Sequence, residues 1–78
     1  MYSLFISNSY GVVMHEVYTD SGKLKENVWE ILFNELEMQG KINPSMTNEL
    51  TKKINMKIEN GEHVNEKISD YLFNISQA

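Results

Sequence analysis

The segment from Leu24 to Gln39, LKENVWEILFNELEMQ, constrains the fold most because, read as a helix, it is apolar around more than half of its circumference. Its apolar side chains cover an arc of roughly 220°, whereas a helix on a protein surface needs little more than about 100°. We therefore expect this helix to be central in the fold or to meet a partner. The side chains of the arc are Leu24, Val28, Trp29, Ile31, Leu32, Phe33, Leu36 and Met38.

Acidic residues occupy the remaining face of this helix. Glu26, Glu30 and Glu37 follow one another at spacings that keep their carboxylates roughly aligned. The pattern fits a solvated helix face, and it also fits a docking surface for a basic partner.

A fourth acid, Glu35, falls inside the apolar arc. An apolar environment disfavours the charged form of a carboxyl group. We expect Glu35 to be structural, reaching solvent at the edge of the core or pairing with Lys53 or Lys57. The alternative is a functional position at an interface.

The N-terminal part predicts a β-hairpin. Residues 2–7 and 12–19 are rich in aromatic and β-branched residues, and they flank Asn8-Ser9-Tyr10-Gly11, which suits a tight connection. Neither face of the second strand is cleanly polar, so we expect both to be partly covered. A hairpin alone is marginally stable, so it must pack on helices or pair with a second copy.

Two further helices are expected after Gly40, which suits the end of the first. One begins at Pro44 or Ser45 and runs to about Glu59, and the other runs from about Glu62 to Ser76 with Phe73 on its far side. The predicted fold is α+β, a single small domain over residues 1–78 in which a hairpin packs against three helices (ββααα). An all-α chain with an extended N-terminus is the alternative, because residues 12–18 suit either structure.

Composition bounds the function. The chain has 78 residues, no cysteine, seven lysines, no arginine and a formal charge of −4. No apolar run approaches the roughly 20 residues of a membrane-spanning helix, and no signal peptide is evident, so we expect a cytoplasmic protein without a membrane association. The many Asn, Ile and Lys codons are typical of an AT-rich source, such as a bacterium or a phage.

The sequence contains no motif for an enzyme, a metal or a cofactor. His15 and His63 are the only histidines, and neither has the spacing of a metal-binding set. No serine stands in a nucleophile motif and no glycine pattern suits a phosphate. We expect no enzymatic activity, no metal and no cofactor.

Nucleic acid is a less favoured partner. The turn between the first and second expected helices could belong to a helix-turn-helix whose second helix carries Lys52, Lys53 and Lys57. However, arginine is absent, the turn is long and the net charge is repulsive toward phosphates. A helical nucleic-acid-associated transcriptional regulator is thus the alternative function.

The preferred interpretation is a small acidic protein-interaction module, such as a phage or mobile-element inhibitor, an antitoxin or an adaptor. Aromatic residues are enriched at the centres of protein contacts, so we expect Trp29, Phe33 and Phe73 to bind the partner. Glu26, Glu30 and Glu37 would surround these anchors. A homodimer, formed if hairpins of two copies pair, remains a second form of association.

Overall fold

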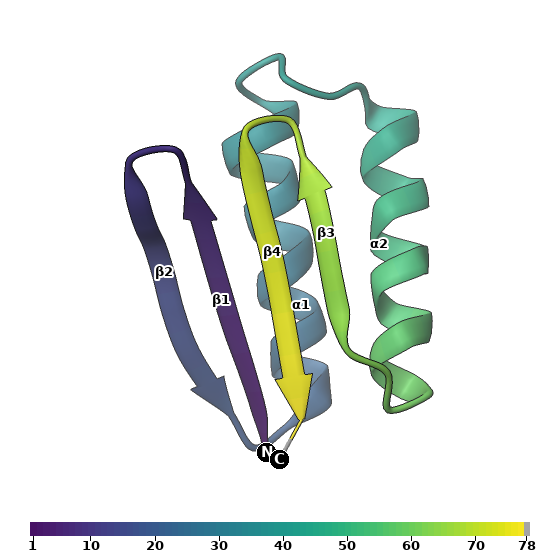
Figure 1. Ribbon diagram of the computed structural model, residues 1–78. Helices are drawn as coiled ribbons and strands as arrows, with labels where there is room; N and C mark the ends of the chain where they lie inside the picture. The colour runs from purple at the N-terminus through teal and green to yellow at the C-terminus, as the bar shows by residue number, and fades with distance from the viewer. Residues whose placement is uncertain (78) are drawn as a thin grey trace.

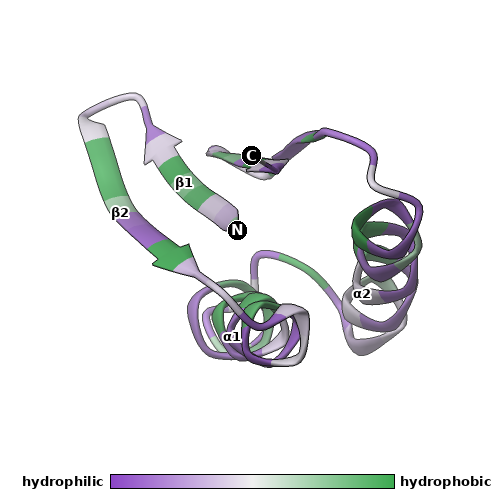
Figure 2. Cartoon of the chain, turned by 90° about the horizontal axis from the view of Figure 1, so that it is seen from below, coloured by the Kyte–Doolittle hydropathy of each residue, from purple (hydrophilic) through white to green (hydrophobic). Residues whose placement is uncertain are grey.

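The computed structural model describes residues 1–77 and has an α+β fold (Figure 1). Four strands form one antiparallel sheet in the order β2-β1-β4-β3, and two helices lie together on one face of it (Figure 2). Among residues 1–77, no helix covers the other face of the sheet. In chain order the elements are β1 (Tyr2–Asn8), β2 (Gly11–Tyr18), α1 (Ser21–Ile31), the π-helical segment η1 (Leu32–Glu37), α2 (Pro44–Glu59), β3 (Val64–Ile68) and β4 (Tyr71–Gln77).

The predicted N-terminal hairpin is confirmed. The Asn8 side chain accepts a hydrogen bond from the Tyr10 backbone N–H at 2.8 Å, and Gly11 takes a φ of 125° that other residues rarely adopt. These two residues turn the chain so that β2 runs back along β1. The all-α alternative is therefore wrong.

The first helix begins at Ser21, after Asp20, whose carboxylate accepts from the Gly22 N–H at 2.8 Å. It continues without a break into η1, where the Met38 N–H reaches the Phe33 carbonyl at 2.8 Å, the longer spacing of a π-helix. Only one stripe of its apolar arc is fully buried. That stripe consists of Leu24, Val28, Leu32 and Leu36.

The first helix is thus not central in the fold, although its wide apolar arc predicts that it is central or meets a partner. It packs on the sheet through that stripe and on α2 beside it, where the Lys25 ammonium bonds the Glu59 carboxylate at 2.8 Å. Much of the remaining apolar arc is open to solvent, with Trp29 42% exposed and Met38 66% exposed.

The second helix is confirmed over Pro44–Glu59. Asn43 caps it by accepting from the Met46 N–H at 2.8 Å, and Pro44 takes the first helical position, where no N–H is needed. Its buried residues include Thr47, Ile54 and Ile58.

The predicted third helix is wrong: that part of the chain forms β3, a tight turn and β4. Val64 lies opposite Ile75, and Ile68 lies opposite Tyr71. The ββααα arrangement is accordingly replaced by ββααββ, with sheet at both ends of the chain. Within the described residues the helices number two, counting α1 and η1 as one.

The first and last strands of the chain meet at the centre of the sheet, where Tyr2 pairs with Gln77 and Ile6 with Phe73. Their helix-facing side chains join those of α1, η1 and α2 in one core. Its most buried members are Leu4, Ile6, Leu24, Val28, Leu32, Leu36, Ile54, Val64, Phe73 and Ile75. In residues 1–77, no helix combines the length and the apolar content required to cross a membrane.

Candidate protein-interaction surface

Strand β2 forms one edge of the sheet, because β1 pairs with it on one side only. Val12, Val13 and Val17 on this strand are 62%, 52% and 56% exposed. Both faces are expected to be partly covered; Met14 and Tyr18 on the helix side are half-buried, whereas Val17 on the other face is exposed. An edge strand offers unpaired backbone N–H and C=O groups, and an apolar one is a template for another chain.

The opposite edge of the sheet has a different character. Strand β3 is shorter, and its outward-facing residues Asn65 and Lys67 are polar. On its helix side Glu66 accepts from Lys53 at 3.0 Å and from Lys57 at 3.2 Å, which ties the strand to α2. The two edges are thus unequal, and β2 is the one that is apolar and uncovered.

The hairpin register contains a bulge. Ile6 pairs with Met14 while Ser7 pairs with Val12, so Val13 is an additional residue on β2. Beyond it the pairing is regular from Met14 to Tyr18. This regular stretch is the part of the edge on which a further strand could be added.

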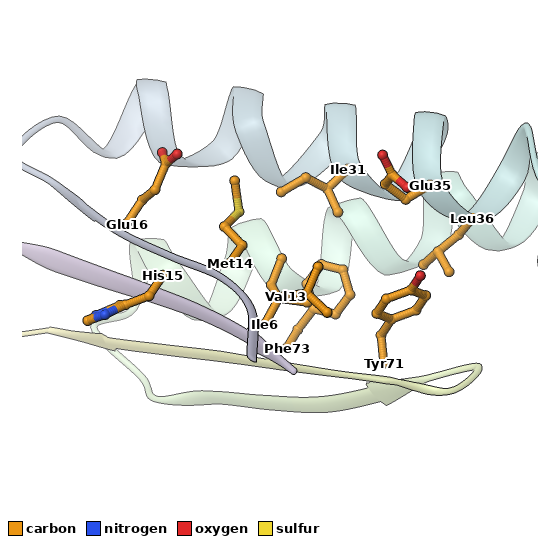
Figure 3. Close-up of a pocket in the computed structure, with 10 residues that line it drawn as sticks. All are labelled: Ile6, Val13, Met14, His15, Glu16, Ile31, Glu35, Leu36, Tyr71 and Phe73. Carbon is orange, nitrogen blue, oxygen red and sulfur yellow. The ribbon is translucent and has the colours of Figure 1, made fainter. Parts of the chain in front are cut away.

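Beneath β2 lies a cavity of about 510 Å³, which we call the β2 groove (Figure 3). It opens between β2 and the α1–η1 helix. Ile6, Met14, Ile31 and Phe73 provide apolar surface, and Met14 points toward Ile31 (Figure 3). The other lining residues are Val13, His15, Glu16, Glu35, Leu36 and Tyr71.

Two carboxylates extend toward the helix side of this groove, Glu16 from β2 and Glu35 from η1 (Figure 3). Glu16 accepts a hydrogen bond from the Tyr18 hydroxyl at 2.6 Å, and Asn27 donates to the same hydroxyl at 2.7 Å. Burial raises the pKa of the Tyr18 phenol, and the bond to Glu16 raises this pKa further. Tyr18 therefore stays a neutral donor that holds Glu16 at the groove.

Glu35 is exposed, so of its two expected positions it takes the one that reaches solvent. It does not pair with Lys53 or Lys57, which both bind Glu66. The helix carries Glu35 round to the β2 side, away from α2. Across residues 1–77 the structure records no hydrogen bond or ion pair to its carboxylate. The Lys41 ammonium lies 4.7 Å from the centre of the ring of Tyr71, which lines the groove, and 3.5 Å from the Asp70 carboxylate.

The open face of the sheet brings a serine and a histidine together. Ser3 Oγ lies 3.1 Å from His15 Nε2, and the His15 ring leans on Phe5 with 5.5 Å between ring centres. Because Phe5 pairs directly with His15, a prediction of the hairpin register from the sequence would also have placed Ser3 near His15. The contact is exposed, no acid is bonded to this histidine in the described chain, and its ring is turned away from the β2 groove (Figure 3). It lacks the third group and the enclosed site that nucleophilic catalysis requires.

His63 lies apart from this contact, exposed between α2 and β3. The part of the chain that the structure describes holds no group of three or more His, Cys, Asp or Glu side chains placed to bind a metal ion.

Trp29 and Phe33 stack on the flank of the first helix, with ring centres 5.2 Å apart and planes 6° from parallel. Glu26 and Glu30 are exposed on the same helix, and Glu37 is half-buried. Lys25, Trp29 and Phe33 follow one another at intervals of four residues, so both rings lie on the same side of the helix as Lys25. Lys25 bonds Glu59 of α2, which places this side toward α2. This α1 flank is a second exposed apolar surface, separate from the β2 groove.

Phe73 lines the β2 groove but is not an exposed anchor. The sequence pattern places it on the far side of a third helix, whereas in β4 it is 0% exposed in the core. The prediction that Phe73 is an exposed anchor is wrong. Side chains alternate between the two faces of a strand, and in β4 both Phe73 and Ile75 point into the core.

Comparison with known proteins returns no relative from which a function could be transferred: no protein family, no curated protein and no solved structure matches this chain.

Proposed function

We propose that this chain is a small non-enzymatic protein-binding module that acts by covering a surface of its partner. One observation carries the proposal: the edge strand β2 exposes Val12, Val13 and Val17 and borders an apolar groove. Natural proteins usually protect an edge strand with charge or cover, and contiguous exposed apolar surface marks interaction sites. A module of this kind would act as an inhibitor, an antitoxin or an adaptor.

The α1 flank is the second surface that supports a binding function. Trp29 and Phe33 provide a flat, stacked aromatic surface, and Glu26 and Glu30 lie beside it. Aromatic anchors contribute binding energy, whereas surrounding charges mainly affect the rate of association. Substitutions on the two surfaces therefore separate their contributions.

The nucleic-acid alternative has less support. Two of its three lysines, Lys53 and Lys57, are occupied by Glu66, which leaves Lys52. The formal charge of −4 opposes binding to phosphates.

The test is quantitative affinity capture by the tagged chain from nuclease-treated lysate of its source cells. Val17→Lys places a charge on the β2 edge, and Asn65→Lys places the same charge on β3 as a matched control. We expect one stoichiometric protein whose capture falls at least about tenfold with Val17→Lys and is unchanged with Asn65→Lys.

Other outcomes point elsewhere. Capture that is lost with Trp29→Ala but kept with Val17→Lys would move the site to the α1 flank. Capture that occurs in untreated lysate and not in nuclease-treated lysate would favour the nucleic-acid regulator. The absence of any stoichiometric partner in both lysates would contradict the proposal.

A further inference from the structure

The backbone of β2 limits how another chain can bind there. The bulge at Val13 leaves a regular edge from Met14 to Tyr18, on which an extended segment of about five residues, or roughly 17 Å, can form a ladder. Main-chain hydrogen bonds would supply affinity in this mode, and pockets for alternate side chains would supply specificity. The β2 groove is such a pocket.

Alternate side chains of an added strand point to the helix layer, where they meet the groove. Between Met14 and Ile31 the groove is apolar, and its volume of about 510 Å³ lies in the range of side-chain and ligand pockets. One groove-facing position of the added strand is therefore suited to a large apolar residue.

The charges at the groove have one sign. Glu16 and Glu35 both reach it, and Lys41 near Tyr71 is already paired with Asp70. Glu16 is held in place by Tyr18. Glu16 and Glu35 lie on opposite sides of Met14 and Ile31 along the groove (Figure 3). A cation on the added strand, one groove-facing position from the apolar residue, would therefore complement the carboxylate at its own end of the groove.

We propose that the β2 groove binds an extended segment of another protein as a fifth strand, and that this segment carries a lysine or arginine two residues from a large apolar side chain. The inference rests on the proposed function and specifies its partner. A second copy of this chain fits less well, because its β2, residues 11–18, contains no lysine or arginine to face Glu16 or Glu35.

The experiment selects ligands for the purified full chain from random twelve-residue peptides displayed on phage. We expect the enriched peptides to share a basic residue two positions from a large apolar one. Amide chemical shifts on binding should change along Met14–Tyr18 more than along β3.

Matched double variants test the charge argument. Glu16→Gln with Glu35→Gln should weaken the binding of an enriched peptide by about tenfold, because the carboxylate that its cation meets is then neutral at either end of the groove. Glu49→Gln with Glu62→Gln changes the net charge equally at exposed positions outside the β2 groove and the α1 flank, and it should leave the dissociation constant unchanged.

The inference would be overturned by no enriched peptide, by enrichment without a basic residue, by equal effects of the two double variants, or by shifts that map away from β2. A stable dimer of the free chain that buries β2 would also overturn it. If the captured partner still depends on Val17 while the peptides ignore Glu16 and Glu35, the proposed function stands and only this inference fails.

Discussion

Phe73 stands at the centre of the sheet, next to Ile6 on β1 and Glu66 on β3, with no exposed surface. Truncation to alanine removes a buried ring and leaves a cavity, so Phe73→Ala should lower the free energy of unfolding by about 3–5 kcal/mol. A domain of this size has little more than that in total. Urea denaturation followed by circular dichroism measures the loss. Tyr10→Ala, at a ring that is 95% exposed, is the control and should change stability by less than about 0.5 kcal/mol.

Glu66 gives the chain a defined dependence on acid. The hydrogen bond from Lys53, with a second from Lys57, lowers the pKa of Glu66 below its ordinary 4.5, although burial acts in the opposite direction. Because the pKa is lower in the folded state, this stabilisation is present above the unfolded pKa and is lost as pH falls through the folded pKa.

Glu66→Gln should therefore cost about 1 kcal/mol at neutral pH, since Lys53 is half-exposed and solvent screens the pair. The difference from the parent chain should shrink as pH falls to about 3. Urea curves at several pH values measure it, with Glu49→Gln, an exposed acid of α2, as control. A pH-independent difference would show that packing, and not charge, is what the substitution changes.

At the scale of elements, the start of α2 depends on one side chain. Asn43 accepts from the Met46 N–H at 2.8 Å and satisfies a donor that the helix leaves unpaired. Asn43→Ala should lower the free energy of unfolding by about 1 kcal/mol. Asn48→Ala, at an exposed interior position of the same helix, should be neutral or slightly stabilising because alanine favours helix. Thermal unfolding compares the two, and equal losses would mean that the cap contributes nothing.

Helices and turns could be predicted from the sequence where capping or turn residues mark their ends. Asn43 with Pro44 marks the start of α2, and Asn8 with Gly11 marks the first turn. The C-terminal hairpin was missed because its turn spans Ser69 and Asp70 only. Val64, Ile68, Tyr71 and Ile75 then face the core at spacings of four, three and four, which is also the spacing of a helical stripe.

The candidate surface was predictable only in part. The exposure of Trp29, Glu26 and Glu30 follows from helix geometry, which is local. Whether β2 is a free edge depends on β4 adding to β1 from the far end of the chain. The sequence pattern predicts a helix where β4 lies, so it predicts neither the free edge of β2 nor the β2 groove beneath it.

At the scale of the whole molecule, the two ends of the chain lie side by side (Figure 1) because Tyr2 pairs with Gln77. The two central strands are thus those farthest apart in sequence, and their pairing requires the largest loop to close. Contacts of this kind slow folding.

A circular permutant tests this topology. It joins the present ends with a short Gly/Ser linker and opens the chain at Gly40, an exposed residue between η1 and α2 that makes no strand pairing. The β1–β4 contact becomes local while the sheet order is kept. We expect the same circular dichroism spectrum and faster folding, by about tenfold, in stopped-flow refolding. A permutant that opens the chain within the first turn, at Ser9, keeps the same linker but separates β1 from β2. It should fold more slowly than the first, and equal rates would show that β1–β4 pairing forms after the rate-limiting step.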